Sequence, residues 1–303
     1  MATATLAAVR TTSAGRSDRW SKVAFMGPLL AFLGALSTFP TVFAIIVSFT
    51  DYKVGSSQPM SFVGVSNYVS IFTNGTTLAT FARTIVLLVI VLPVQITLGF
   101  LVAKLFFRMR DVPLAGLIRT LYLIPVMLPE IVVGLLFGYM LNPRVGIVNY
   151  YMGSLGIRPD WFGSTALAFV TIMLLILWQW TPLATIIFYG GLLGIPNEVR
   201  EAAALDGAGS VRSALSIELP MLRKVIGVVV LLAGIQLVGT FAVVYITTQG
   251  GPGTTTNVLS FELYRQAFVY FNTGYAAALS MITLVVVVAL SQLLVRFVFK
   301  EEK

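Results

Sequence analysis

Six long apolar segments set the fold class of this 303-residue chain. They lie at about residues 25–49, 81–103, 115–141, 165–192, 223–246 and 274–298. Each is near or above the roughly 20 residues that a helix needs to cross the hydrocarbon core of a bilayer, about 30 Å thick. A transmembrane β-strand needs only about 10 residues and alternates apolar with polar positions. The sequence therefore predicts an all-α integral membrane protein with six transmembrane helices.

The composition supports this class and excludes several kinds of chemistry. Only 11% of the residues are charged and the mean hydropathy is +0.92, whereas soluble domains carry roughly 25% charged residues. The chain has no cysteine and no histidine, which excludes disulfides, thiol nucleophiles, Ser-His-Asp triads and His/Cys metal sites. It also lacks the G-x-x-x-x-G-K-[S/T] pattern of a P-loop. We expect no catalytic residue, no metal and no cofactor bound by this chain.

The distribution of positive charge predicts the orientation in the membrane. If the N-terminus is cytoplasmic, 15 of the 20 Lys and Arg residues fall on the cytoplasmic side, as the positive-inside rule requires. These loops also explain the net charge of +8 better than a nucleic-acid site does. We expect both termini in the cytoplasm, a disordered tail at 1–22 and a single six-span domain at 23–300.

Residues 196–220 form a polar loop between the fourth and fifth apolar segments. Pro196 favours a helix start, and two acids in the first turn suit the helix dipole, which predicts a helix over Asn197–Leu205. Gly207 can take the positive φ that ends a helix. A second short helix is expected over Val211–Ile217. Such a loop is either an ordinary solvated segment or a surface offered to a cytoplasmic partner.

The spacing inside this loop is more specific than its helical pattern. Its fixed positions follow E-A-A-x3-G-x9-I-x-L-P and are Glu201, Ala202, Ala203, Gly207, Ile217, Leu219 and Pro220. This pattern resembles the cytoplasmic motif of the membrane-embedded permease subunits of bacterial ABC importers. The resemblance implies a coupling helix between spans 4 and 5, seated in a cleft of a separate ATPase. The residues implied to couple to the ATPase are Glu198, Glu201, Ala202, Ala203, Asp206, Gly207, Ile217, Leu219 and Pro220.

A second motif lies in the outer loop that follows the fifth apolar segment. Its signature residues are Gly250, Gly251, Pro252 and Thr256. With Thr248 and Leu259 they are similar to the outer loop of carbohydrate permeases of the maltose and glycerol-3-phosphate group. The extra leading spans and large outer domain of the maltose permease have no counterpart here, so the chain is more similar to compact six-span members. A permease for a non-carbohydrate solute, or a secondary transporter, remains the alternative.

The resemblance also implies the partners and the location of the chain. It implies a second homologous permease in a heterodimer, two copies of a cytoplasmic ABC ATPase that carry ATP and Mg, and an extracytoplasmic solute-binding protein. The lipid bilayer and a carbohydrate substrate are the remaining partners that it implies, and no nucleic acid is expected to bind. The chain would be a non-catalytic, multi-pass protein of the bacterial inner membrane.

A few polar residues inside the apolar segments are candidates for the substrate path. Glu130 is the only acid there, about 16 Å beyond Arg119 along a helix, and an ionisable group near mid-membrane is a functional candidate. An alternative is a structural role beside two nearby prolines. The other candidates, which could bind sugar hydroxyls or hydrogen-bond between helices, are Gln179, Gln236, Gly239 and Thr240. Gly239 and Thr240 are expected to share a helix face with Gln236.

Overall fold

The computed structural model describes residues 14–299. Residues 1–13 and 300–303, which include the first part of the expected disordered tail, lie outside that range. Helix α1 spans Ala14–Ser48, so residues 14–22 are helical, and the prediction of a disordered tail is wrong for them. Within the described range, the only strand-like feature is an isolated bridge between Thr50 and Phe62. The all-α fold class is confirmed.

Five helical segments among the described residues are long and apolar enough to cross a membrane. They are formed by α1, by α3 (Gly75–Arg108), by α8 (Thr165–Leu193), by α12 (Arg223–Val238) continued in α13 (Ala242–Thr247), and by α15 (Thr273–Phe299). They correspond to five of the six predicted spans. The prolines inside α1, α3 and α8 do not end these helices, as predicted, because neighbouring groups can satisfy the freed carbonyls.

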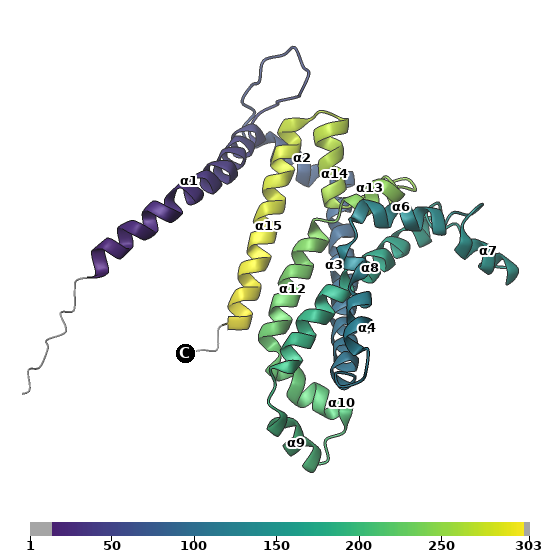
Figure 1. Ribbon diagram of the computed structural model, residues 1–303. Coiled ribbons are helices and arrows are strands. Elements are labelled where there is room, and N and C mark those ends of the chain that lie inside the picture. Colours follow the sequence, from purple (N-terminus) through teal and green to yellow (C-terminus); the bar gives the residue numbers. More distant parts are fainter. Residues whose placement is uncertain (1–13, 300–303) are drawn as a thin grey trace, which may run out of the picture.

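The segment at 115–141 differs from the prediction of one continuous span. It forms three short helices: α4 (Ala115–Tyr122), α5 (Ile124–Met127) and α6 (Glu130–Met140). Leu128 is extended, with a ψ of 136°, because the ring of Pro129 disfavours a helical conformation in the residue before it. The chain therefore changes direction, and α6 lies across the upper part of the bundle while α4 stands beside the lower part of α3 (Figure 1).

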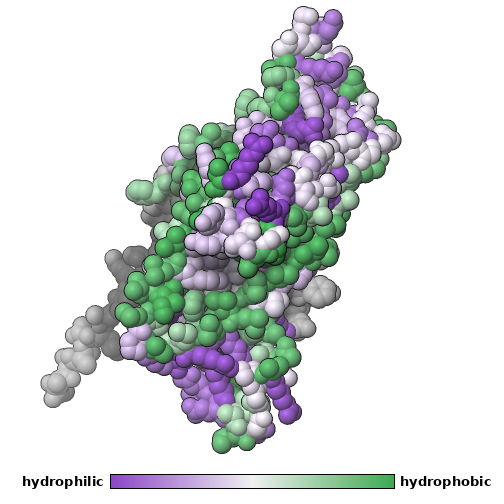
Figure 2. All heavy atoms as spheres, turned by 90° about the vertical axis from the view of Figure 1, so that its right-hand side faces the viewer, coloured by the Kyte–Doolittle hydropathy of each residue, from purple (hydrophilic) through white to green (hydrophobic). Residues whose placement is uncertain are grey.

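The remaining helices lie at the two ends of the bundle (Figure 1). One end carries α2 (Ser66–Thr73), α14 (Leu259–Tyr264) and the π-helical turn η2 (Arg265–Val269), and α7 (Ile147–Ser154) projects to the side. The opposite end carries α9 (Asn197–Leu205), α10 (Ser210–Ser213), the π-helical turn η1 (Ala214–Glu218) and α11 (Leu219–Met221). On the face shown in Figure 2, apolar side chains gather in a band between hydrophilic ones above and below.

The centre of the bundle is the packed pair of α3 and α8. Leu87 and Val91 meet Ile172 and Ile176 in one buried cluster, and a second cluster around Phe188 lies nearer α9. The two helices approach so closely that a Cβ on Gly99 would lie 2.9 Å from the Ala184 Cβ. Small residues allow such close packing in membranes, where helix association depends on van der Waals contact.

Helix α1 is packed very differently from the central pair. It contacts α15 near one end and diverges from the bundle along the rest of its length (Figure 1). Its apolar side chains are largely exposed, with Phe32 at 63% and Phe39 at 73%. In a membrane protein such a surface faces lipid or another membrane subunit, because soluble proteins rarely expose an apolar area of this size to water.

Candidate functional site

The loop at 196–220 folds at its start as the sequence predicts. Helix α9 begins at Asn197, directly after Pro196. Gly207 has a φ of +70°, and the Ala208 amide then donates to the Ala203 carbonyl over 2.9 Å. Glycine is needed at this point because a left-handed backbone is unfavourable for residues with a Cβ. The chain thereby turns back beneath the bundle immediately after α9.

The second helix of this loop differs from the expected regular helix over Val211–Ile217. Only Ser210–Ser213 is α-helical, and the chain widens into the π-turn η1 before Pro220. Pro220 has no amide hydrogen to donate to the Ser216 carbonyl, so the regular α-helical ladder cannot continue there. Single π-turns of this kind are frequent at functional sites.

The predicted coupling residues occupy different depths in the loop. Exposed positions are Glu198, Glu201, Ala202, Asp206, Gly207 and Pro220, while Ala203 is buried and Ile217 and Leu219 are half-buried. Three large apolar side chains that the motif did not single out are also exposed, namely Leu205 at 89%, Val211 at 72% and Leu215 at 62%. Large apolar residues in an otherwise polar loop are a sequence pattern that could have identified these three as candidate contact residues.

A cavity of about 250 Å³ lies between this loop and the end of α3. Lys104 and Arg108 of α3 line one side, and Arg200 and Glu218 of the loop line the other. Burial lowers the pKa of the Arg200 guanidinium, whereas the Glu218 carboxylate acts in the opposite direction. The loop therefore meets α3 through charged side chains at this cavity, and through an apolar cluster in which Ala214 packs with Ala103 and Phe106.

The residues predicted for the substrate path lie in two places. Gln179 and Glu130 lie near the break at 128–129, and Gln236, Gly239 and Thr240 lie at the end of α12. Gln179 is 3% exposed, and its Nε2 donates to the Leu128 carbonyl over 2.9 Å. This is the carbonyl that the break before Pro129 leaves without a helical partner, so Gln179 stabilises the broken segment. Glu130 begins α6 and is half-buried, and the Trp180 side chain of α8 lies next to its carboxylate.

Gln236 faces a residue that the sequence analysis did not select. Gln236 of α12, Gln95 of α3 and Trp180 of α8 line a cavity of about 20 Å³, which is room for about one water molecule. The Oε1 atoms of both glutamines are buried without a hydrogen-bond donor among the described residues. Helix α12 ends at Val238, but the Gly239 amide still donates to the Ile235 carbonyl and the Thr240 hydroxyl to the Gln236 carbonyl. Gly239 is exposed and Thr240 is 2% exposed.

The outer-loop signature residues hold the loop in one conformation. Thr256 is fully buried, and its Oγ1 donates to the Gly251 carbonyl over 2.7 Å and hydrogen-bonds the Thr248 hydroxyl, also at 2.7 Å. Gly250 has a φ of +83°, and a Cβ there would lie 2.8 Å from the ring of Phe261. The signature thus describes a tightly packed turn, with the tip around Pro252 partly exposed.

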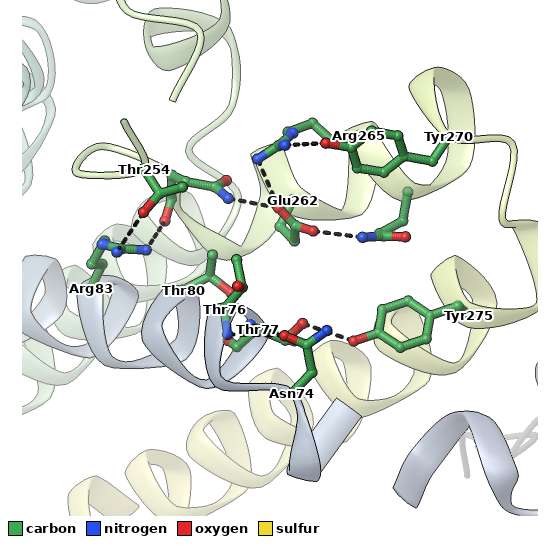
Figure 3. A network of polar contacts seen from close by, with 12 residues as sticks. Asn74, Thr76, Thr77, Thr80, Arg83, Thr254, Glu262, Arg265, Tyr270 and Tyr275 are labelled. Carbon is green, nitrogen blue, oxygen red and sulfur yellow. Dashed lines mark hydrogen bonds and ion pairs between the residues drawn. The ribbon is translucent and has the colours of Figure 1, made fainter. Parts of the chain in front are cut away.

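A polar network ties this outer loop to α3 and α14 (Figure 3). The Glu262 carboxylate is 3% exposed and accepts hydrogen bonds from Asn257 Nδ2 at 2.6 Å and Gln266 Nε2 at 2.7 Å. Arg83 Nη2 donates to the Thr254 hydroxyl over 3.1 Å. Arg265 adds an ion pair to Glu262 at 3.4 Å. Arg83 and Glu262 were not predicted, because nothing in their local sequence marks them.

These features define a class: a multi-pass α-helical membrane protein with a polar helical loop at one end and a tightly packed turn at the other. The fold is similar to a solved structure titled bacterial alginate ABC transporter in complex with alginate pentasaccharide-bound periplasmic protein. The TM-score is 0.81 over 92% of this chain and 93% of that one, at 17% identity.

The family assignment follows from the sequence comparisons. The family described as binding-protein-dependent transport system inner membrane component matches residues 95–298. The sulfoquinovosyl glycerol permease protein SmoG of Agrobacterium fabrum is 30% identical, over 88% of this chain and 86% of that protein. The multiple sugar-binding permease protein MsmF of Streptococcus mutans is 29% identical, over 87% and 90%. The chain belongs to this family and is a membrane permease subunit of an ABC importer.

Proposed function

We propose that this permease carries a sugar or a related polyol and forms half of the translocation path together with a second, homologous permease. Two of its relatives are named for the transport of sulfoquinovosyl glycerol and of multiple sugars, and a structural neighbour is an alginate transporter. Amide oxygens accept hydrogen bonds from hydroxyl groups, so Gln95 and Gln236 would bind such a cargo in a state with a wider cavity, since here their cavity has room for about one water molecule.

The observation that carries the coupling proposal is the exposed surface of the cytoplasmic loop. Leu205, Val211 and Leu215 are exposed in the same loop as the exposed acids Glu198 and Glu201. Exposed apolar side chains rimmed by polar ones mark protein interaction sites. We assign this surface to a cytoplasmic ATPase, present in two copies that bind ATP and Mg. Movement of the ATPases then reaches the spans through α9 and α10 as rigid-body motion.

The other partners follow from the opposite end of the fold and from α1. A solute-binding protein docks on the outer loops, where the turn around Pro252 is held rigidly and partly exposed. The exposed apolar sides of α1 face lipid and the second permease. In this arrangement both termini and the loop at 196–220 are cytoplasmic.

The test is purification of the tagged chain from its native membrane in gentle detergent, followed by mass spectrometry. A P-loop ATPase and a second permease are expected to co-purify. Leu205→Glu should release the ATPase and keep the second permease, because it places a charge in the apolar contact. Leu155→Glu is the matched control, since Leu155 is 75% exposed near α7. A chain that purifies alone and transports without ATP after reconstitution would refute the proposal.

The cargo is tested separately with the co-purified binding protein. Calorimetric titration with mono- and oligosaccharides, polyols and glycerol phosphate is expected to give binding for one of these. Binding of an amino acid, polyamine or phosphate instead would leave the importer proposal standing and overturn the carbohydrate class.

A further inference from the structure

One lysine at the cytoplasmic end of α3 contacts both ends of the α10–η1 segment. Lys104 Nζ donates to the Ser210 carbonyl over 2.9 Å, at the start of α10. The same ammonium forms an ion pair with Glu218 Oε2 at 2.7 Å, at the end of η1. These partners are 106 and 114 residues away in the chain. The contact therefore links two distant segments through one side chain.

The ion pair is shielded from water on both sides. The Lys104 side chain is 14% exposed and the Glu218 side chain is 7% exposed. Breaking such a pair by removing one partner is strongly destabilising, whereas replacing both partners by apolar residues is often neutral. The pair is thus a poor source of stability and a specific way of fixing one segment against another.

Neighbouring contacts complete the attachment of the loop. Arg108, one turn beyond Lys104 on α3, donates to the Ser210 hydroxyl. The Arg200 guanidinium lies 4.1 Å from the centre of the Phe107 ring of α3, and its Nη1 donates to the Ile195 carbonyl over 2.9 Å, just after α8. These side chains attach the loop to α3 and to the end of α8. Helices α3 and α8 in turn pack against each other along the bundle. The connection of the loop to α12 instead passes through the irregular segment η1–α11.

We propose that Lys104 is a positioning residue that makes α3 move together with the cytoplasmic loop. A displacement of α9 and α10 is delivered to α3 through the contacts of Lys104 with Ser210 and Glu218. Gln95 lies about two and a half turns, or roughly 13 Å, further along α3. A shift of α3 therefore moves one wall of the cavity shared by Gln95 and Gln236. This inference rests on the proposed docking of the loop on an ATPase.

The test uses the complete transporter in proteoliposomes, with ATP hydrolysis and cargo uptake measured on the same preparation. The variants are Lys104→Met, Glu218→Gln and the double variant Lys104→Met/Glu218→Met, which leaves no buried charge without a partner. Lys53→Met is the matched control, because Lys53 is exposed in the first outer loop. Uptake per ATP hydrolysed should fall about tenfold in the double variant, within the range known for residues that carry coupling between sites.

The outcomes separate this inference from the proposed function. If the wild-type chain recruits no ATPase, the proposed function fails. If the double variant assembles, hydrolyses ATP and keeps uptake per ATP within about twofold of wild type, only the role of Lys104 is overturned. A purely structural role predicts that result, since the double variant restores packing without the charges.

A distance measurement tests the same idea even if a variant transports poorly. The chain has no cysteine, so spin labels can be placed at Leu101→Cys on α3 and Ser216→Cys in η1. In the otherwise wild-type chain the distance between the labels should be equal with and without ATP. In the Lys104→Met/Glu218→Met background it should change with ATP. A distance that already changes in the wild-type background would show that α3 does not follow the loop.

Discussion

Replacing Glu262 by glutamine tests whether the buried carboxylate holds the outer loop in place. The Glu262 carboxylate accepts hydrogen bonds from Asn257 and Gln266 and pairs with Arg265. Asn257 is fully buried and begins the return of the loop towards α14. Glutamine keeps the size of the side chain but has only one acceptor oxygen. Its NH₂ group would then face the NH₂ group of either Asn257 or Gln266, and that donor would lose its acceptor.

The magnitude follows from the contacts that are lost. A hydrogen bond to a charged group contributes about 1.5–3 kcal/mol, a neutral one about 0.5–1.5 kcal/mol, and a buried donor without a partner costs about 1–3 kcal/mol. We expect Glu262→Gln to reduce the local stability of the loop by about 2–3 kcal/mol. This is an increase of about 30- to 150-fold in the population of the opened loop.

Hydrogen exchange of the loop amides measures this population directly. The amides of Gly251, Thr256 and Asn257 are hydrogen-bonded within the loop, and their exchange should accelerate by the same factor. Asp111→Asn is the matched control, because the Asp111 side chain is 88% exposed and its ion pair contributes little. Exchange within about threefold of wild type in Glu262→Gln would refute the view that this charge fixes the loop.

The other predictions concern the loop at 196–220, with its proposed coupling role, and the polar residues inside the apolar segments. Gly207→Pro should abolish uptake while membrane insertion, followed by the amount of protein in the membrane fraction, stays normal, because proline cannot adopt the φ of +70° found there. Glu201→Arg should have the same effect by reversing a charge on the exposed docking surface; normal uptake in either variant would remove the coupling assignment. Gln179→Leu should lower the thermal unfolding temperature, since the Leu128 carbonyl loses its donor at a cost of about 1–3 kcal/mol; an unchanged temperature would contradict the structural role. Glu130→Gln should alter the dependence of substrate-stimulated ATP hydrolysis on substrate concentration if this residue lines the path, and an unchanged curve would assign it to structure alone.

Much of the local structure could be read from the sequence, because short-range chemistry decides it. The bounds of α9 follow from Pro196 and from the glycine turn at Gly207, whose φ is +70°. Five spans follow from apolar length alone, since any such segment must satisfy its backbone hydrogen bonds within a helix in lipid. The family follows from residue spacing in two loops, a property of the sequence that needs no coordinates.

The break at 128–129 shows where local rules fall short. The prolines near it were known, but four other prolines inside spans leave their helices continuous. At the break, Gln179 of α8 satisfies the freed Leu128 carbonyl, while α8 stays continuous through Pro182 with Gln95 donating to the Trp180 carbonyl. The presence of a proline in an apolar segment therefore does not by itself predict whether the helix is interrupted there.

Only the tertiary structure brings Lys104 to Glu218, Gln95 to Gln236, and Arg83 to Thr254. The partners in each pair come from helices or loops that are far apart in the chain. Of these residues only Gln236 was a candidate from the sequence, and its partner was not predicted, because an isolated polar side chain at a helix end or inside a span is compatible with many partners. The sequence determined the helices, their approximate order in the membrane and the family. The packing of α3 against α8, α12 and the two loops decided which polar groups act together.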